Sequence, residues 1–472
     1  MDLNKLLKIA NYIILCMIWF FYFNNGDAVY VNFNTILLGT FLSLQIGFFL
    51  FVEKRKRDPF VILLCLQMVL YFLLRILTLL NYSFSNVFLR FPFFASDLNY
   101  ALIFIIVANF VFYFGLTINS IIPRFFAYSV NVKPIKTHLV IGLIVIAYFF
   151  AFYDKIGLSF LEDIMSMIQS LVVNLGTLMF MAIVFLLLFK GRINKWTNYF
   201  VITGIVIMVV IQTLSGSRSG ILSIINYIIF ALLAIHDSIK IKKKYLIASL
   251  FLLPLMIVIF AISTFLRPRL EDRGKIGGET FEVLKDFDLN KTATEGADLV
   301  LVGIYDRIGF LDYCAETIAN SDKYNVIFNP FFYLKSIVDN ILTPGFTVFD
   351  TPRVSNSMSF VYNARGTPSL SKVSESYQSD EFTLYGEFYA LFGKWFSLIP
   401  IFFLGYIFKK IYINLNTNNV YNFYLKRAII LFVFYATLNS FGIDWILLDV
   451  TAIFFTYHLF KRFFKYTIIT EN

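Results

Sequence analysis

The chain has 472 residues, of which 59% are hydrophobic and 19% aromatic, while only 15% are charged. A soluble domain is about 45–50% apolar and about one quarter charged, so this composition excludes an ordinary soluble protein and indicates a multi-span membrane protein. The three cysteines, Cys16, Cys65 and Cys314, have no spacing typical of a disulfide framework or a zinc site. The net charge of +10 could suggest nucleic acid, and its distribution decides against that partner.

Long apolar runs recur along the chain. About 20 apolar residues cross about 30 Å of hydrocarbon as a helix, and these runs lack the alternation of barrel strands, so they predict helices. The first run has a basic start and no small-residue cleavage site after it, which indicates a retained span. Twelve spans are predicted, at about 6–23, 35–52, 59–80, 97–118, 137–153, 170–189, 197–213, 219–235, 245–266, 387–408, 426–440 and 442–460.

Lysine and arginine in the short loops predict the orientation. With the N-terminus inside, the short inner segments carry 23 of these residues and the short outer loops only three, Arg90, Lys155 and Arg218. Cytoplasmic loops carry this excess of basic residues, so we expect both termini in the cytoplasm. The basic charge is thereby explained by membrane orientation, and no nucleic acid is expected as a partner.

One outer loop is long and polar. Residues 267–383 form a 117-residue segment, and loops of that length cross the membrane whatever their charge and are usually functional or disordered. Residues 298–319 predict an amphipathic helix, with Tyr305, Asp312 and Glu316 sharing one face. The fold class is therefore an all-α polytopic membrane protein. Its predicted parts are nine spans in 1–266, a large helical periplasmic loop in 267–383 and three spans in 384–472.

Arg218 stands alone in the turn TLSGSRSG, at the outer end of the seventh predicted span. An arginine at this level is often a snorkelling anchor. Backbone N–H groups of a small-residue turn at a helix N-terminus also suit a phosphate, and arginine adds bidentate contacts to it. From the turn alone, both interpretations are open.

Further arginines gather at the outer membrane edge. Arg267, Arg269 and Arg273 open the large loop within FLRPRLEDRGK, and Arg307 lies on the predicted amphipathic helix. The alternative for the first three is interfacial anchoring of the ninth span. Arg75 lies within the third predicted span, where an ionisable residue is a functional candidate; a structural pair with Asp449 in the last span is equally compatible with the sequence.

Carboxylates of the loop are candidates for a general base toward a hydroxyl. They are Asp306, Asp312, Glu316, Asp380, Glu381 and, beyond its end, Glu387. All three histidines, His138, His236 and His458, fall at predicted cytoplasmic ends of spans. An outer-face mechanism through imidazole, either Ser–His or zinc–His, is therefore not expected, and no cofactor or metal is expected.

Three short motifs and the predicted architecture resemble those of a known protein family. The motifs are SGSRSG (215–220), YDRIGFLD (305–312) and the region of Gly386 and Gly393 in LYGEFYALFG. Arg267 to Gly278 also fits an Arg-x10-Gly pattern. Together with many spans and one late outer loop, they resemble the bacterial O-antigen polymerases of the Wzy type, which polymerise oligosaccharide repeat units.

The resemblance implies a GT-C-like, metal-independent glycosyltransferase of the bacterial inner membrane, active at the periplasmic face. Its donor and acceptor would be undecaprenyl-diphosphate-linked oligosaccharides, and a chain-length regulator protein is left open as a partner. Arginines would stabilise the leaving diphosphate. The residues expected to bind it are Arg218, Arg267, Arg269, Arg273 and Arg75. The catalytic candidates are Asp312 as the general base, with Arg307 and Tyr305 beside it.

Three other functions remain as alternatives. An O-antigen ligase has a similar topology but carries a functional histidine in its large outer loop, which this chain lacks. A flippase for lipid-linked oligosaccharides would show charges along many spans, whereas here Arg75, Asp449 and Lys394 are the interruptions. A membrane scaffold would tolerate replacement of the arginines in the outer loop.

Overall fold

The computed structural model is mostly helical and divides into two compact units. Unit 1 comprises Met1–Pro123, Ile304–Asn414 and Val433–Leu448, and unit 2 comprises Arg124–Gly303, Leu415–Phe432 and Asp449–Asn472. The structure describes residues 3–56, 58–80, 94–118, 130–132, 183–184, 187, 195–214, 218–235, 258–259, 262–263, 265–266, 278–287, 309–342, 347–363, 366–374, 382–415, 420–439 and 468–470. These two units follow contacts within the structure, whereas the predicted parts 1–266, 267–383 and 384–472 follow the membrane crossings. The units therefore do not test the predicted parts.

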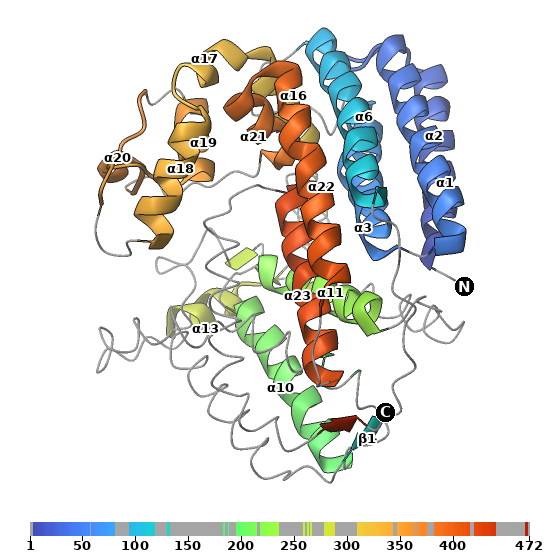
Figure 1. Cartoon of the computed structure of the whole chain (residues 1–472), viewed down its shortest axis with the longest axis vertical. Coiled ribbons are helices and arrows are strands. Elements are labelled where there is room, and N and C mark those ends of the chain that lie inside the picture. The colour runs from blue at the N-terminus through green and yellow to red at the C-terminus, as the bar shows by residue number, and fades with distance from the viewer. Residues whose placement is uncertain are drawn as a thin grey trace. The chain divides into compact units, whose positions relative to one another are not determined.

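Five stretches of the described residues are long and apolar enough to cross a membrane (Figure 1). They comprise α1 (Leu3–Asn25), most of α2 (Phe33–Lys56), the continuous helix Pro59–Leu80, α6 (Ala95–Thr117) and Trp395–Ile413. The first four coincide with the first four predicted spans to within a few residues. The prediction of a multi-pass membrane protein is thereby confirmed, and the number of twelve spans stays a prediction.

The third span is one helix with a change of winding inside it. Its first part, α3 (Pro59–Gln67), begins after Asp58, whose carboxylate accepts a hydrogen bond of 3.0 Å from the Phe60 backbone N–H. A π-helical segment, η1 (Met68–Leu73), follows, and α4 (Leu74–Leu80) completes the span. Short π-helical segments within α-helices are frequent at functional sites, and hydropathy gives no sign of this one.

The tenth predicted span, 387–408, is wrong in its boundaries. Helix α21 (Thr383–Phe392) ends at Gly393, whose φ of 73° suits glycine and terminates the helix. A 3₁₀ turn, η4 (Lys394–Ser397), then leads into α22 (Leu398–Ile413). The membrane-length stretch therefore begins at Trp395, because a break in backbone conformation at Gly393 interrupts a run that is continuous in hydropathy.

Helices α6 and α22 pack backbone against backbone. A methyl group at Gly405 would lie 2.7 Å from the Phe112 carbonyl oxygen, and one at Gly115 would collide with the carbonyl of Phe402. Small residues at such positions let membrane helices approach closely. These two glycines thus set the spacing of the two spans.

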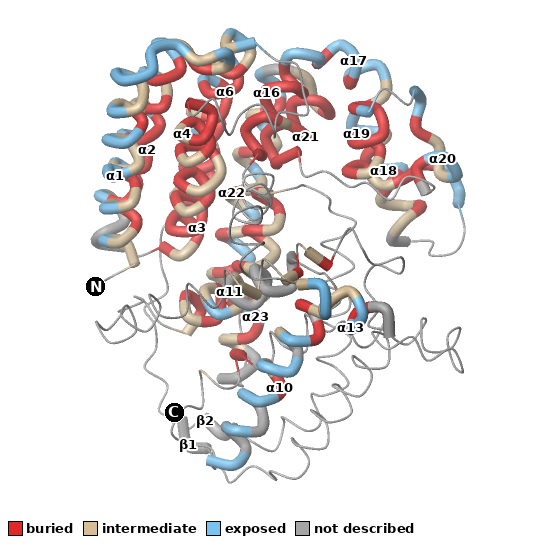
Figure 2. Tube along the Cα trace, turned by 180° about the vertical axis from the view of Figure 1, so that it is seen from behind, coloured by how far each residue is buried: buried red, intermediate tan, exposed pale blue. Residues whose placement is uncertain are grey.

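Polar side chains tie the spans together inside the apolar bundle. Each amide donates to a backbone carbonyl of another helix, which satisfies a group that would be costly to leave bare in lipid. The bonds are Asn11 Nδ2 to Ser43 O at 3.1 Å, Gln45 Nε2 to Ile106 O at 2.8 Å, and Gln67 Nε2 to Leu438 O at 2.7 Å. Figure 2 shows buried residues concentrated in α3, α4, α16 and α21, while α1 is largely exposed along one side.

Aromatic side chains gather at one end of the spans. Trp19, near the end of α1, packs on Phe33 at the start of α2, with ring centroids 6.4 Å apart. Tyr100, in the first turns of α6, lies 6.3 Å from Trp395 at the start of the last of the five stretches. Such aromatic belts occur at membrane–water interfaces. All four residues belong to span ends that the charge pattern assigns to the outer side.

The described part of the large loop is helical. Its elements are α16 (Phe310–Ala319), α17 (Ser321–Asn325), α18 (Pro330–Ile337), the π-helical η3 (Val338–Leu342), α19 (Val354–Tyr362) and α20 (Leu370–Ser374). The expected continuous helix over 298–319 is corrected, because Gly309 lies in a turn and α16 begins at Phe310. Its predicted polar face is also buried, since Asp312 and Glu316 are enclosed by the protein.

Unit 2 contains two of the further predicted spans and a short sheet. Helices α10 (Lys195–Leu214) and α11 (Arg218–Ile235) coincide with the seventh and eighth predicted spans. Helix α13 covers Gly278–Lys285, and strands β1 (Val130–Val132) and β2 (Ile468–Thr470) pair antiparallel. The described residues are otherwise mostly helical, which agrees with the expected all-α membrane protein. Helix α23 (Val420–Asn439), near the eleventh predicted span, is shared between the two units.

The structure describes the remaining four predicted spans only in part or not at all. Spans 137–153 and 442–460 lie outside the described residues. In 170–189 and 245–266 only isolated helical residues are described.

Candidate functional site

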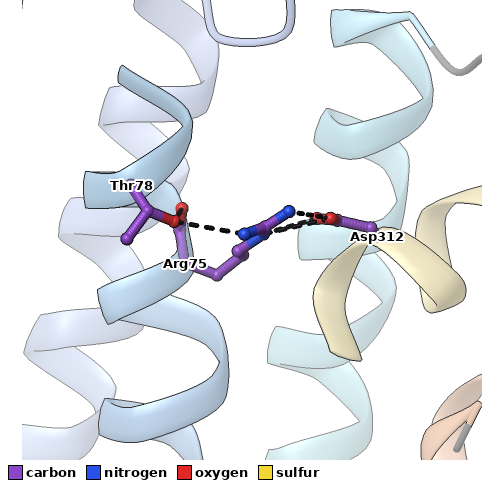
Figure 3. Close-up of polar contacts among 3 residues, drawn as sticks. All are labelled: Arg75, Thr78 and Asp312. Atoms are coloured by element: carbon purple, nitrogen blue, oxygen red, sulfur yellow. Dashed lines mark hydrogen bonds and ion pairs between the residues drawn. The ribbon is translucent and has the colours of Figure 1, made fainter. Parts of the chain in front are cut away.

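Two of the predicted site residues meet in unit 1. Arg75, on α4, extends toward Asp312, on α16 (Figure 3). Its Nε donates to Oδ1 and Oδ2 of Asp312 at 3.0 Å each, and its Nη2 makes a further, shorter contact with Oδ2. Thr78 lies one turn further along α4, within 3.5 Å of Nη1, and its hydroxyl donates to the Arg75 carbonyl. The contact therefore joins residues 237 positions apart in the chain.

Both members of this pair are buried, with Arg75 2% and Asp312 3% exposed. Burial raises the pKa of the Asp312 carboxyl above its ordinary value, and the charge and hydrogen bonds of Arg75 offset only part of this rise. The bidentate geometry is that of an ionised carboxylate with a guanidinium. Removing one partner of such a pair leaves a buried charge uncompensated, so the pair fastens α16 to the third span.

This pairing changes the chemistry expected of Asp312. A carboxylate that accepts three contacts from a guanidinium is a weak proton acceptor until it leaves that partner. The general-base role predicted for Asp312 would require that separation. While it is paired with Arg75, Asp312 holds α16 in place against the third span.

A second carboxylate lies one turn further along α16. Glu316 is 4% exposed; its Oε2 accepts a hydrogen bond of 2.6 Å from the Tyr324 hydroxyl, and its Oε1 accepts one of 3.3 Å from Asn320. Burial raises the pKa of Glu316 to about 7, against the lowering effects of Tyr324 and Lys323. A carboxyl group that titrates near neutrality is suited to general acid–base chemistry.

Helix α21 packs closely on α16. A methyl group at Gly386 would lie 3.5 Å from the Cys314 Cα, so the glycine faces the backbone of α16 directly. Thr383, at the start of α21, is fully buried with φ 63°, a conformation that is unusual for a β-branched residue. Its hydroxyl accepts from the Gly386 N–H at 3.2 Å. Such strain persists where the surrounding structure imposes it, often at functional sites.

The same helix contacts the fourth span. The Tyr385 hydroxyl donates to Asn109 Oδ1, within α6, at 2.5 Å. The Tyr389 ring lies edge-on to Phe104 of α6, with centroids 5.1 Å apart. Helices α16 and α21 therefore form one layer that packs along the third and fourth spans.

The opposite end of the third span carries another buried ion pair. The Lys409 ammonium contacts the Asp58 carboxylate, and both residues are enclosed, at 3% and 4% exposure. Lys409 also lies over the Phe60 ring, 5.8 Å from its centroid. The charge pattern assigns both residues to the cytoplasmic side, and their contact agrees with that grouping. Sequence reasoning counted them only as loop charges.

The remaining predicted site residues are described less fully or not at all. Arg218 is the first residue of α11, in unit 2. Asp449 and five of the predicted site residues lie outside the described residues: Tyr305, Arg307, Arg267, Arg269 and Arg273. Of the predicted set, the structure thus brings together Arg75 and Asp312.

Sequence reasoning missed three features of this region. They are the hydrogen bond from Tyr324 to Glu316, the strained Thr383 and the contact of Tyr385 with Asn109. Only Asn109 had a readable signal, as a polar residue within an apolar span. Among the described residues, no group of three or more His, Cys, Asp or Glu side chains is arranged to hold a metal ion.

Comparisons with known proteins add no family. No protein-family model, curated protein or solved structure matches the chain. The fold and the site define its class as a mostly helical, multi-pass membrane protein in which part of a long loop is packed against two spans.

Proposed function

We propose that the chain is a membrane glycosyltransferase that polymerises lipid-diphosphate-linked oligosaccharide repeat units, as the resemblance of its sequence implies. The growing chain is the donor and moves onto a hydroxyl of the next lipid-linked unit. The C–O bond between the donor sugar and its diphosphate breaks, a new glycosidic bond forms, the acceptor hydroxyl loses its proton to a base and the lipid diphosphate leaves.

The observation that carries the proposal is the contact between α16 and α21. These helices contain the end of the YDRIGFLD motif and the LYGEFYALFG motif, which are separated by more than 70 residues in sequence. Gly386 of one motif lies against Cys314, two residues beyond the other. Arg75 holds the same layer to the third span. A loop fixed against the spans supports a lid that excludes water from a hydrolysable donor.

The arginines of the outer edge supply the electrostatic part of the mechanism. A diphosphate is a good leaving group when its growing negative charge is stabilised, and arginine does this through bidentate contacts. Arg218, Arg267, Arg269 and Arg273 have this role in the proposal. Arg75, paired with Asp312, acts instead on the position of α16, and Glu316 replaces Asp312 as the preferred general base.

The test is the replacement of Arg218. In a cell that depends on this chain for its surface polysaccharide, Arg218→Ala should abolish long polymer while leaving single repeat units on the surface glycolipid. Arg218→Lys keeps the charge but loses the bidentate fork, so it should shorten the polymer. Gel electrophoresis of the glycolipid, with protein levels checked by immunoblot, measures both.

Lys372→Ala is the control, because it removes an exposed positive charge from α20, in the large outer loop. It should leave the polymer ladder unchanged. A normal ladder from Arg218→Ala at normal protein level would refute the polymerase. Loss of all surface sugar, single units included, would favour the flippase.

A further inference from the structure

Apolar side chains are exposed on one part of the large loop. On α18, Phe331 is 74% and Leu334 57% exposed, and they lie three residues apart, on one face of the helix. Val348 and Phe349, in the strap 347–353 that follows η3, are 59% and 48% exposed. We call these four residues the α18 patch. Phe331 also follows Pro330, which starts the helix after an Asn329 cap.

The two halves of the α18 patch are held together. The Asp339 carboxylate, on η3, accepts backbone N–H bonds from Val348 at 2.7 Å, Phe349 at 3.0 Å and Thr351 at 2.7 Å. Burial raises the pKa of Asp339, but these bonds outweigh it and lower the pKa, so the carboxylate stays ionised in mild acid. The strap is therefore fixed beside α18 and is part of a preformed surface.

A basic side chain, Lys335, borders the α18 patch. The Lys335 Nζ lies 5.6 Å from the centroid of the Phe349 ring, so helix and strap form one continuous surface. Aromatic and aliphatic residues with a lysine at their edge are typical of segments that insert at the boundary between headgroups and acyl chains, with the ammonium reaching the headgroups.

The position of the α18 patch in unit 1 indicates what kind of molecule covers it. Figures 1 and 2 show α18 level with the middle of the spans and with the half of α1 nearer the N-terminus, and not beyond the span ends. The loop is also tethered to the bilayer, since Trp395 begins a membrane-length stretch shortly after it. An exposed apolar surface at the level of the spans is at the depth of the acyl chains that surround them.

We propose that the α18 patch is a membrane-docking surface, which seats the large loop against the bilayer through Phe331, Leu334, Val348 and Phe349. The occupant is lipid. The inference rests on exposure and position in unit 1 and is independent of the polymerase proposal.

The experiment places a nitroxide on single cysteines of the full-length chain in vesicles of phosphatidylethanolamine and phosphatidylglycerol. Cys16→Ser provides the background, because Cys65 and Cys314 are buried and burial raises the pKa of Cys314 to about 12. Phe331→Cys and Leu334→Cys probe the α18 patch. Asp322→Cys, at an exposed position of α17, is the matched control.

Power saturation compares collisions with oxygen, which concentrates in lipid, and with a water-soluble nickel chelate. The oxygen-to-nickel ratio at positions 331 and 334 should exceed that at 322 several-fold. A ratio at 331 as low as that at 322 overturns the proposal. So does strong dipolar broadening at 331 that disappears when the chain is diluted with unlabelled copies, since the occupant would then be a second copy.

Discussion

At the scale of single residues, the site is defined by two carboxylates in different environments on one helix. Asp312 is bound bidentately by Arg75, whereas Glu316 accepts hydrogen bonds from the neutral side chains of Tyr324 and Asn320. Both are buried. Burial raises the pKa of both groups, but Asp312 is also held by a charged partner, which gives it a structural role.

Loss of either member of the Arg75–Asp312 pair should destabilise unit 1. Arg75→Ala or Asp312→Ala should lower the free energy of unfolding by about 3–5 kcal/mol, because a charge is left buried without its partner. The double variant Arg75→Leu with Asp312→Leu should be more stable than either single variant. Thermal unfolding in detergent measures this, with Lys372→Ala as the exposed control; additive losses in the double variant would contradict it.

Glu316 should make stability depend on pH. Its pKa is raised from 4.5 to about 7 in the folded chain, so the folded state holds its proton more tightly than the unfolded state. The free energy of unfolding should therefore fall as pH rises from about 4.5 to about 7, by at most about 1.4 kcal/mol per pH unit for one proton. Glu316→Gln should remove this component of the slope, and an unchanged slope would exclude it.

At the scale of elements, close helix packing depends on glycine at a few positions. Gly405 faces the Phe112 carbonyl within α22 and α6, whereas the nearest atom to a methyl group at Gly386 would be at an ordinary contact distance of 3.5 Å. Gly393 has a different function, because its φ of 73° ends α21. Gly405 thus sets the spacing of α6 and α22, and Gly393 defines where the last membrane-length stretch begins, whereas a methyl group at position 386 has room.

Gly405→Ala should separate α6 from α22 and lower the midpoint of thermal unfolding by several degrees, since overpacking costs about 1–3 kcal/mol. Gly386→Ala is the matched control and should be tolerated. Differential scanning fluorimetry of the purified variants gives both midpoints. Equal midpoints for the two variants would argue against tight α6–α22 packing.

At the scale of the whole molecule, a buried ion pair holds the third span near each of its ends. Asp58 pairs with Lys409 at its start, and Arg75 pairs with Asp312 near its finish. The charge pattern of the loops assigns the first pair to the cytoplasmic side and the second to the outer side. The aromatic belt of Trp19, Phe33, Tyr100 and Trp395 lies at the ends assigned to the outer side.

This sidedness can be measured with a membrane-impermeant maleimide. In the Cys16→Ser background, a cysteine at Asp322 should be labelled in intact spheroplasts, whereas one at Lys243, in a predicted inner loop, should be labelled only after permeabilisation. The reverse pattern would invert the predicted topology and with it the outer-face mechanism.

The sequence alone determined the class of the protein, because hydropathy over about 20 residues and the bias of lysine and arginine are local properties. It also located four of the five membrane-length stretches and singled out Arg75 and Asp312. Only the tertiary structure decided that these two residues are partners, since their contact joins positions 237 apart. The tertiary structure also buries the polar face of α16, and this burial raises the pKa of Glu316 to near neutrality. The spacing of residues along the chain reveals neither property.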